Sequence, residues 1–311
     1  MPENLQLDYG HSTLNPPASA PARTDPRYHL SSDLLGKLEK LAQARFEISE
    51  LTDLDLDEWR MDAAEPYWPI AQSVNASSEI EGEEIAADEL TLWFAAATTP
   101  AAHIDNELSR RMEAIKSIYG ACLWALTSER TTLITYDFVL EVHRRMFSTT
   151  EPSLAGKLKE KSVYIRGAGY SVETLPPDRT AEFLRALCER TNEKFQAARE
   201  YGEYSSFLCT AEFLLDFLAI HPFADGNGRA ARLLSTFLLE RSGYHFSRFY
   251  PLDNVILETR NEHYRALFQA QRHWYRPDED LTPWIQYYID SVFTQWSRAL
   301  QRVRDRRGNA R

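Results

Sequence analysis

The sequence has few of the features that mark disulfide-rich, membrane-spanning or nucleic-acid-binding proteins. Its three cysteines, Cys122, Cys188 and Cys209, are scattered within apolar helical patterns, which predicts buried thiols in a reducing compartment rather than disulfides or a metal site. No apolar run reaches the roughly 18 residues of a membrane span, and no signal peptide is expected. The net charge of -11 lacks the positive footprint of nucleic-acid binding. We expect a cytoplasmic protein without membrane or nucleic-acid partners.

The composition is that of a globular chain. Hydrophobic residues make up 43% of the 311 positions and charged residues 26%, which is enough for a sizeable core. The prolines within residues 1–27 predict a flexible or extended arm. Residues 28–100 are expected to form an N-terminal helical region, residues 101–300 the main body with the C-terminal helices, and residues 301–311 a basic tail.

Apolar residues recur at helical spacing along most of the chain. The first helix is expected from Ser31, with Ser32 or Asp33 as its cap. Further helices are predicted over Asp105–Thr127, Thr135–Phe147 (where His143 is interpreted as a core or surface histidine), Thr180–Glu200, Phe207–Ile220, residues 227 to about 243, Asn254–Gln271 and Leu281–Ile289. Val163–Ile165 and Tyr170–Leu175, with glycines between them, favour a β-hairpin.

One stretch, residues 221–232 with the sequence HPFADGNGRAAR, carries residues suited to phosphate chemistry. It connects two predicted helices. Asp225 is a residue type that caps helices, and Gly226 and Gly228 let the backbone approach a ligand and turn N–H groups toward it. A helix that starts with such N–H groups binds phosphate.

The charged residues of the same stretch complete this interpretation. Arg229 and Arg232 are three positions apart, so they lie on one side of the helix and offer forked donors to phosphate oxygens. His221 ends the preceding helix and can take a proton from a hydroxyl. Asp225 is a hard oxygen ligand suited to Mg²⁺. The plainer alternative is a polar connection with a satisfied histidine, but packing alone does not require this set of residues.

The stretch resembles the motif H-P-F-x-D-G-N-G-R-x-x-R of the Fic family at every fixed position. Fic proteins mostly transfer AMP from ATP to a hydroxyl side chain of a target protein. The resemblance implies that His221 is the base, that Asp225 holds magnesium and that Phe223 anchors the loop. It assigns the α- and β-phosphates to an anion hole of Gly226, Asn227 and Gly228, and the β- and γ-phosphates to Arg229 and Arg232.

A second stretch, upstream, is similar to the S/T-x-x-x-E-G/N pattern of Fic proteins that carry an inhibitory helix. Ser77, Glu81 and Gly82 match it, and Ser77 and Glu81 share a helix face because they are four positions apart. The resemblance implies that Glu81 reaches Arg232 and blocks the γ-phosphate. The plainer interpretation is an ordinary helix end with Gly82 as its cap.

The predicted hairpin corresponds to the flap of Fic proteins, which covers the nucleotide and holds the target by strand addition. The family usually has Arg where Lys159 stands. The resemblance implies that a target protein docks along residues 159–175. It also implies a set of nucleotide-lining residues on the flap and on the later helix: Val163, Tyr164, Ile165, Arg166, His263, Tyr264 and Gln271. The helix expected over Asn254–Gln271 departs from the family, which often has a Tyr-Tyr pair where His263-Tyr264 stands. The family also has an Asn near the adenine and ribose, where this chain has Gln271.

The resemblance covers roughly residues 60–295 and implies a mainly α Fic fold with a short β-hairpin flap. The expected function is transfer of AMP from ATP, with Mg²⁺, to a Tyr, Ser or Thr hydroxyl of a target protein or of the chain itself, restrained by Glu81. One alternative is removal of AMP from a modified protein, with Glu81 aligning a water molecule. Another is a nucleotide-binding module that catalyses nothing. A kinase-like reaction is disfavoured, because the small Gly228 admits the α-phosphate. The resemblance also allows a homodimer.

Overall fold

The computed structural model describes residues 10–13, 27–52, 67–82, 106–127, 133–167, 170–201 and 205–309. Helices predominate, so the mainly α fold predicted from the sequence is confirmed. Among these residues no helix is both long and apolar enough to span a bilayer. In chain order the elements are β1 (Gly10–Thr13), α1 (Ser32–Thr52), α2 (Tyr67–Ile80), α4 (Asn106–Thr127), α5 (Tyr136–Phe147), β2 (Tyr164–Gly167), β3 (Tyr170–Glu173), α6 (Pro177–Tyr201), α7 (Ser205–Ile220), α8 (Asn227–Arg241), η1 (Phe246–Arg248), α9 (Leu252–Glu258), α10 (Arg260–Gln271) and α11 (Thr282–Asn309).

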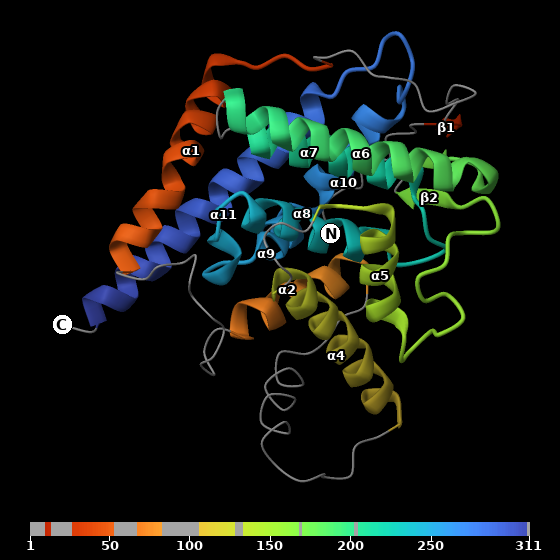
Figure 1. Ribbon diagram of the computed structural model, residues 1–311, viewed down its shortest axis with the longest axis horizontal. Helices are drawn as coiled ribbons and strands as arrows, with labels where there is room; N and C mark the ends of the chain where they lie inside the picture. Colours follow the sequence, from red (N-terminus) through yellow and green to blue (C-terminus); the bar gives the residue numbers. More distant parts are fainter. Residues whose placement is uncertain are drawn as a thin grey trace, which may run out of the picture.

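Helix α7 lies in the interior of the molecule. Residues 206–220 are all buried. Most of them are apolar, and the buried carboxylates of Glu212 and Asp216 form ion pairs with Lys194 and Arg190 of α6. Helices α6, α8 and α11 pack against it (Figure 1). Two buried tryptophans from the C-terminal part of the chain form hydrogen bonds with α7. Trp284 Nε1 donates to the Ala211 carbonyl at 2.7 Å, and Trp274 Nε1 donates to the Asp216 carboxylate at 2.8 Å. Helix α7, which His221 follows, is therefore held from several sides.

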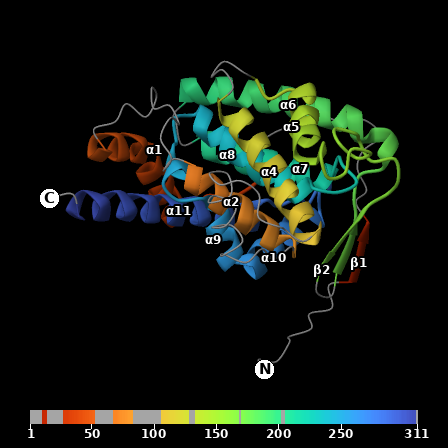
Figure 2. The same ribbon diagram turned by 90° about the horizontal axis from the view of Figure 1, so that it is seen from below.

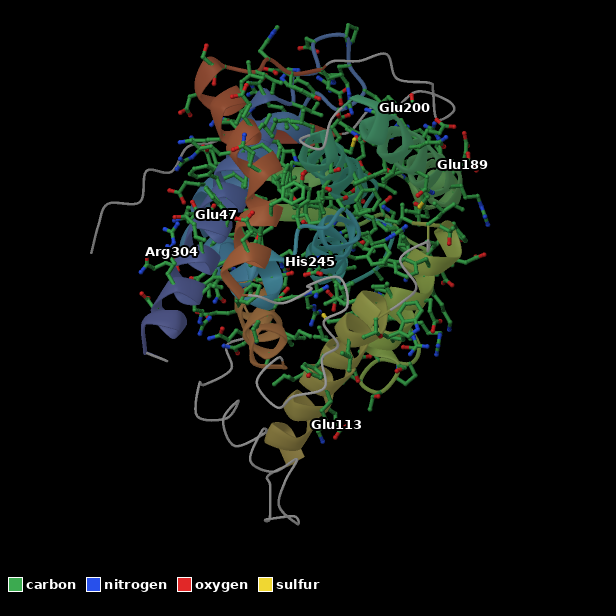
Figure 3. The ribbon with its side chains drawn as sticks, turned by 60° about the vertical axis from the view of Figure 1, so that its left-hand side comes forward. Glu47, Glu113, Glu189, Glu200, His245 and Arg304 are labelled. Atoms are coloured by element: carbon green, nitrogen blue, oxygen red, sulfur yellow. The ribbon has the colours of Figure 1, made fainter. Side chains whose placement is uncertain are left out.

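The N-terminal helix α1 runs beside the C-terminal helix α11 (Figure 2). Leu34, Leu38 and Leu41 of α1 are buried in the core. At the outer surface Arg304 of α11 pairs with Glu47 of α1 at 3.0 Å, as the side-chain view in Figure 3 shows. The predicted start of the tail, residue 301, lies within α11, which continues to Asn309.

Helix ends follow local side-chain chemistry. The α1 cap is Ser31, not Ser32 or Asp33 as expected, because Ser31 Oγ accepts a hydrogen bond from Leu34 N at 3.2 Å. Thr135 caps α5 in the same way, accepting from Phe138 N at 3.0 Å.

The single helix expected over Asn254–Gln271 is wrong, since two helices, α9 and α10, meet at Thr259. Thr259 leaves the helical region, with φ of -112° and ψ of 32°. Its hydroxyl lies 2.7 Å from the Val255 carbonyl and 2.9 Å from the Tyr287 hydroxyl. These side-chain bonds compensate for the interrupted helix.

The hairpin predicted from the sequence is present and belongs to a three-stranded sheet. β2 and β3 are antiparallel, with Tyr164 opposite Glu173, and β1 adds to β3 in parallel, with Gly10 opposite Tyr170. The strand order is β1-β3-β2. The strands project from one end of the helical body (Figure 2). A short part of the predicted N-terminal arm thus lies on the hairpin, and β3 is paired on both of its edges.

Replacing Phe237 tests the packing beneath α8. Phe237 is 2% exposed and stacks on Phe138 of α5 with ring centroids 4.6 Å apart. We expect Phe237→Ala to lower the free energy of unfolding by about 3–5 kcal/mol, because it leaves a cavity in the core. Phe46→Ala, at a side chain that is 55% exposed on α1, should change it by less than about 0.5 kcal/mol. Urea denaturation measures both, and equal losses would contradict this account of the core.

Candidate active site

The turn between α7 and α8 is fixed by its own side chains. Phe223 is fully buried and forms an antiparallel bridge with Leu158. The Asn227 side chain forms hydrogen bonds with both backbone groups of Phe223: its Oδ1 accepts from Phe223 N and its Nδ2 donates to the Phe223 carbonyl, both at 2.9 Å. Phe223 therefore anchors the turn in the core. Because these hydrogen bonds occupy the Asn227 side chain, Asn227 can contribute to an anion hole through its backbone N–H.

The first helical turn of α8 is shaped by glycine. Gly226, and not Asp225, is the N-cap, and its φ of 75° lies in the left-handed region. A Cβ at Gly226 would overlap the ring of Phe147. Asp225 lies one residue earlier, and its Oδ1 accepts from Gly226 N at 2.6 Å. No side chain caps the helix start, so N–H groups of the first turn are available to an anion.

His143 of α5 supports this turn from below, a contact that the sequence did not predict. Its ring stacks on Phe223 at 3.7 Å between centroids. Gly156 N donates to Nδ1 at 3.0 Å, so the ring proton lies on Nε2, which donates to the Asp225 carbonyl at 3.0 Å. Burial lowers the pKa of His143 to about 4. The neutral ring thus joins α5, the segment before the hairpin and the turn.

His221 has the geometry of a base. It is a non-glycine residue with a φ of 51° directly after α7, a strained conformation of the kind found at functional sites. Its Nδ1 lies 3.3 Å from the Leu218 carbonyl, which places the proton on Nδ1 and leaves the lone pair on Nε2. Burial, and then the charge of Lys159, lower the pKa of His221 to about 4. The imidazole is therefore neutral near pH 7.

Arg229 lies on the exposed carboxylate of Asp225. Its Nη2 is 3.1 Å from Asp225 Oδ2, and the guanidinium stacks over Phe147 at 5.1 Å. The Arg229 side chain is 6% exposed, whereas that of Asp225 is 60% exposed. Both therefore lie beside the N-terminus of α8, where the sequence predicted them.

Arg232 is buried, and three residues hold it. Its Nε donates to Ser77 Oγ at 2.8 Å, and its Nη2 donates to the Ser77 carbonyl at 2.9 Å and to Glu81 Oε1 at 2.8 Å. Asp253 Oδ1 lies 3.3 Å from Nε. The contact between Glu81 and Arg232, predicted across 151 positions, is thus present in the structure.

Glu81 lies directly over the helix N-terminus. A Cβ at Gly228 would overlap Glu81 Oε1 and would stand 3.1 Å from Arg232 Nη1. Gly82, with a φ of 91°, ends the α2 segment. Burial raises the pKa of Glu81, but attraction to Arg232 outweighs it, so the pKa is lowered. An ionised carboxylate therefore occupies the space beside Gly228 that an anion would need.

Asp253 of α9 is a member of the site that sequence reasoning missed. It is 3% exposed, and its Oδ2 accepts from Ser73 Oγ of α2 at 2.6 Å. Burial raises its pKa, and the charge of Arg232 acts in the opposite direction. The sequence offers no local signal for Asp253, because its partners come from α2 and α8.

The hairpin begins beside the turn. Thr174 N donates to the Val163 carbonyl at 3.0 Å, just before β2. Tyr164, Ile165 and Arg166 belong to β2. Tyr164 is 50% exposed. Leu175 N donates to the Ala219 carbonyl at 3.4 Å, so the return of the hairpin touches the end of α7.

The three predicted nucleotide residues of α10 have different surroundings. His263 is buried edge-on against Tyr264, and burial together with the charge of Arg232 lowers its pKa to about 3. The Tyr264 hydroxyl donates to the Ile80 carbonyl, next to Glu81, at 3.4 Å. Gln271 is 2% exposed at the end of α10, and its Nε2 has no hydrogen-bond partner among the described residues. The structure thus brings His263 and Tyr264 to the Glu81 side of the site.

The donor set fits a magnesium ion that takes most of its ligands from phosphate and water. Asp225 is an exposed carboxylate at the helix N-terminus. Among the described residues no group of three His, Cys, Asp or Glu side chains could hold a metal alone. Mg²⁺ commonly binds through one or two carboxylates and substrate phosphates.

Residues 133–239 match the Fic/DOC family. These residues are a Fic domain. They contain α5, the hairpin, α6, α7, the turn and most of α8, whereas α2 with Glu81 lies before them.

Known relatives and structures agree with this assignment. The chain is 29% identical over 185 residues to protein adenylyltransferase fic-1 of Caenorhabditis briggsae, a match that covers 60% of this chain and 32% of that protein. The chain thus spans about a third of the length of this curated relative. A Fic family protein from Desulfovibrio desulfuricans superimposes with a TM-score of 0.68 at 18% identity, over 89% of this chain and 77% of that one. A fragment of Fic-1 from Caenorhabditis elegans gives 0.63 at 22% identity, over 86% and 72%. Both structures share the fold.

Gly226→Ala tests whether the turn needs glycine for space as well as for backbone freedom. We expect a loss of more than about 2 kcal/mol in the free energy of unfolding, because left-handed strain adds to the overlap with Phe147. Gly82→Ala is the matched control, since Gly82 also has positive φ but a methyl group there would meet nothing within 4 Å. It should cost about 1 kcal/mol. Chemical denaturation compares the two, and similar losses would show that the overlap with Phe147 does not matter.

Proposed function

We propose that the protein transfers AMP from ATP to a Tyr, Ser or Thr hydroxyl of a protein. One observation carries this proposal: the turn between α7 and α8 holds both an uncapped helix N-terminus, which can bind phosphate, and His221, whose Nε2 lone pair can accept a proton. The names of the relatives, protein adenylyltransferases, support the choice of ATP and AMP.

The residues can divide the reaction among them. The N–H groups of Asn227 and Gly228, joined by that of Gly226 when it leaves Asp225 Oδ1, bind the α- and β-phosphates. Arg229 and Arg232 bind the β- and γ-phosphates. His221 Nε2 takes the proton of the target hydroxyl as its oxygen attacks the α-phosphorus. The bond from the α-phosphorus to the bridging oxygen breaks, and pyrophosphate leaves. Mg²⁺, held by Asp225, supplies charge neutralisation when it is bound. Positioning and electrostatics supply the rest of the rate.

The target segment adds to the flap. β3 is paired with both β1 and β2, so among the described strands β2 offers an outer edge that can pair with an extended peptide. Tyr164, half exposed on β2, provides an apolar contact for that peptide. Main-chain pairing would place a hydroxyl near His221 without demanding one target sequence.

Glu81 restrains the transfer. Its carboxylate binds Arg232 and stands over Gly228, so the γ-phosphate loses a donor and meets a negative charge. ATP would then bind weakly, or with its α-phosphate turned away from the attacking hydroxyl.

Removal of the Glu81 carboxylate should release this restraint. We expect Glu81→Gly to raise the labelling of the protein itself, or of lysate proteins, from ATP radiolabelled at the α-phosphate by at least about tenfold. Glu81→Gln should act in the same direction, while Glu79→Gln, two positions earlier on α2, should not. Labelling that is equal in wild type and Glu81→Gly would remove the inhibitory role.

Loss of the base should stop transfer while leaving nucleotide binding. In the Glu81→Gly protein we expect His221→Ala to lower labelling by about 10²–10⁴-fold, with ATP binding by calorimetry within a few-fold. Because the pKa of His221 is about 4, labelling by the parent should fall only as pH drops toward that value. His29→Ala, at an exposed position, serves as control. Retained labelling without His221 would refute its role as base.

Removal of AMP is a second candidate, because Glu81 stands beside the phosphate-binding turn and could align a water molecule. Wild type and Glu81→Gly would be incubated with an AMP-modified protein. Faster AMP release by wild type would favour removal. ATP binding by Glu81→Gly without any transfer or release would instead indicate a binding module.

A further inference from the structure

Lys159 forms hydrogen bonds on both sides of the proposed base, His221. It lies in the segment between α5 and β2 and is 3% exposed. Its backbone N–H donates to the Pro222 carbonyl at 2.9 Å, and its Nζ donates to the Ile220 carbonyl at 2.8 Å. One residue therefore binds the carbonyls immediately before and after His221.

The same ammonium reaches the flap. Nζ also donates to Thr174 Oγ1 at 2.9 Å, and Thr174 Oγ1 donates to the Val163 carbonyl at 2.9 Å. Val163, just before β2, and Thr174, just after β3, are thus linked through Lys159 to the Ile220 carbonyl, which precedes His221. A peptide paired with the hairpin would be placed in a fixed relation to the imidazole.

Burial of this lysine costs stability. Among the described residues no carboxylate forms an ion pair with Nζ, and its two acceptors are uncharged. Burial lowers the pKa of Lys159 to about 7. An ammonium without a charged partner is expensive in the interior, so packing alone does not explain a lysine here.

We propose that Lys159 is a positioning residue for His221. It holds the strained His221 backbone, through the carbonyls of Ile220 and Pro222, so that the imidazole keeps a fixed position relative to the flap. The inference rests on the proposed role of His221 as base. The charge of Lys159 adds to the effect, because a nearby cation disfavours protonation of the imidazole. The other charged groups that act on His221 are Glu81 and Asp225, and both favour protonation.

A titration of His221 tests the inference without any need for activity. The 311-residue protein, labelled with ¹³C-histidine, would be titrated by NMR, and the His221 signal would be assigned by its absence in His221→Ala. We expect Lys159→Met to raise the His221 pKa by at least about half a unit and Lys159→Arg to keep it low. Lys157→Met removes a charge from an exposed position of the same segment and should change nothing. Coincident titrations of wild type and Lys159→Met would overturn the electrostatic part.

Labelling tests the positioning itself. In the Glu81→Gly protein, Lys159→Met should lower kcat for self-labelling about tenfold or more with KM for ATP within twofold, Lys159→Arg should restore part of it, and Lys157→Met should leave it unchanged. Equal kcat in Lys159→Met and its parent would overturn the proposal. So would a rise in KM for ATP with unchanged kcat.

Two further outcomes separate the causes. If the Met variant does not fold, Lys159→Gln, which keeps a donor without charge, takes its place in both experiments. If no variant labels, the parent included, while Lys159→Met still shifts the His221 titration, then the transfer proposal fails and the link between Lys159 and His221 stands.

Discussion

A buried guanidinium, that of Arg232, is the interaction on which the arrangement of the site depends. An arginine that is removed from water needs acceptors on all of its donating edges, and an unpaired one would be strongly destabilising. α8 cannot supply those acceptors itself, so they come from α2 and α9: Ser77, Glu81 and Asp253. Burial of this charge therefore adds polar contacts with α2 and α9 to the apolar packing of α2, whose Ile70, Val74 and Ile80 lie in the core.

The same cluster would let the site keep its shape if Glu81 moved away. Glu81 is the exposed member, with 31% of its side chain accessible, whereas Asp253 is almost fully buried. Departure of Glu81 would leave Ser77 and Asp253 in contact with the Nε edge, while Nη1 faces Gly228. Arg232 would thus keep its orientation after the loss of this one carboxylate. Loss of the Glu81 carboxylate would change the charge beside Arg232 without requiring the backbone around Arg232 to move.

The parts of the site that sequence reasoning anticipated are those whose chemistry is local or carried by a known motif. The twelve residues of the turn sit next to one another in the chain, and glycine, histidine and arginine at that spacing have few other uses. The Glu81–Arg232 contact came from the family resemblance, since nothing in the spacing of two segments 151 positions apart predicts it. The roles of Asp253, His143 and Lys159 were not predicted. Each acts through a partner on another element, and each resembles an ordinary residue of its own helix or loop. The interruption at Thr259 was missed for a similar reason, because one of its two hydroxyl contacts is with Tyr287 of α11.

The separation between Glu81 and Arg232 also has a consequence for the nascent chain. At a synthesis rate of about 5–20 residues per second, the ribosome needs on the order of 8–30 s to pass from one to the other. The segment that carries the carboxylate is thus made well before the turn that it contacts. The contact between Glu81 and Arg232 can therefore form only after α8 has been synthesised.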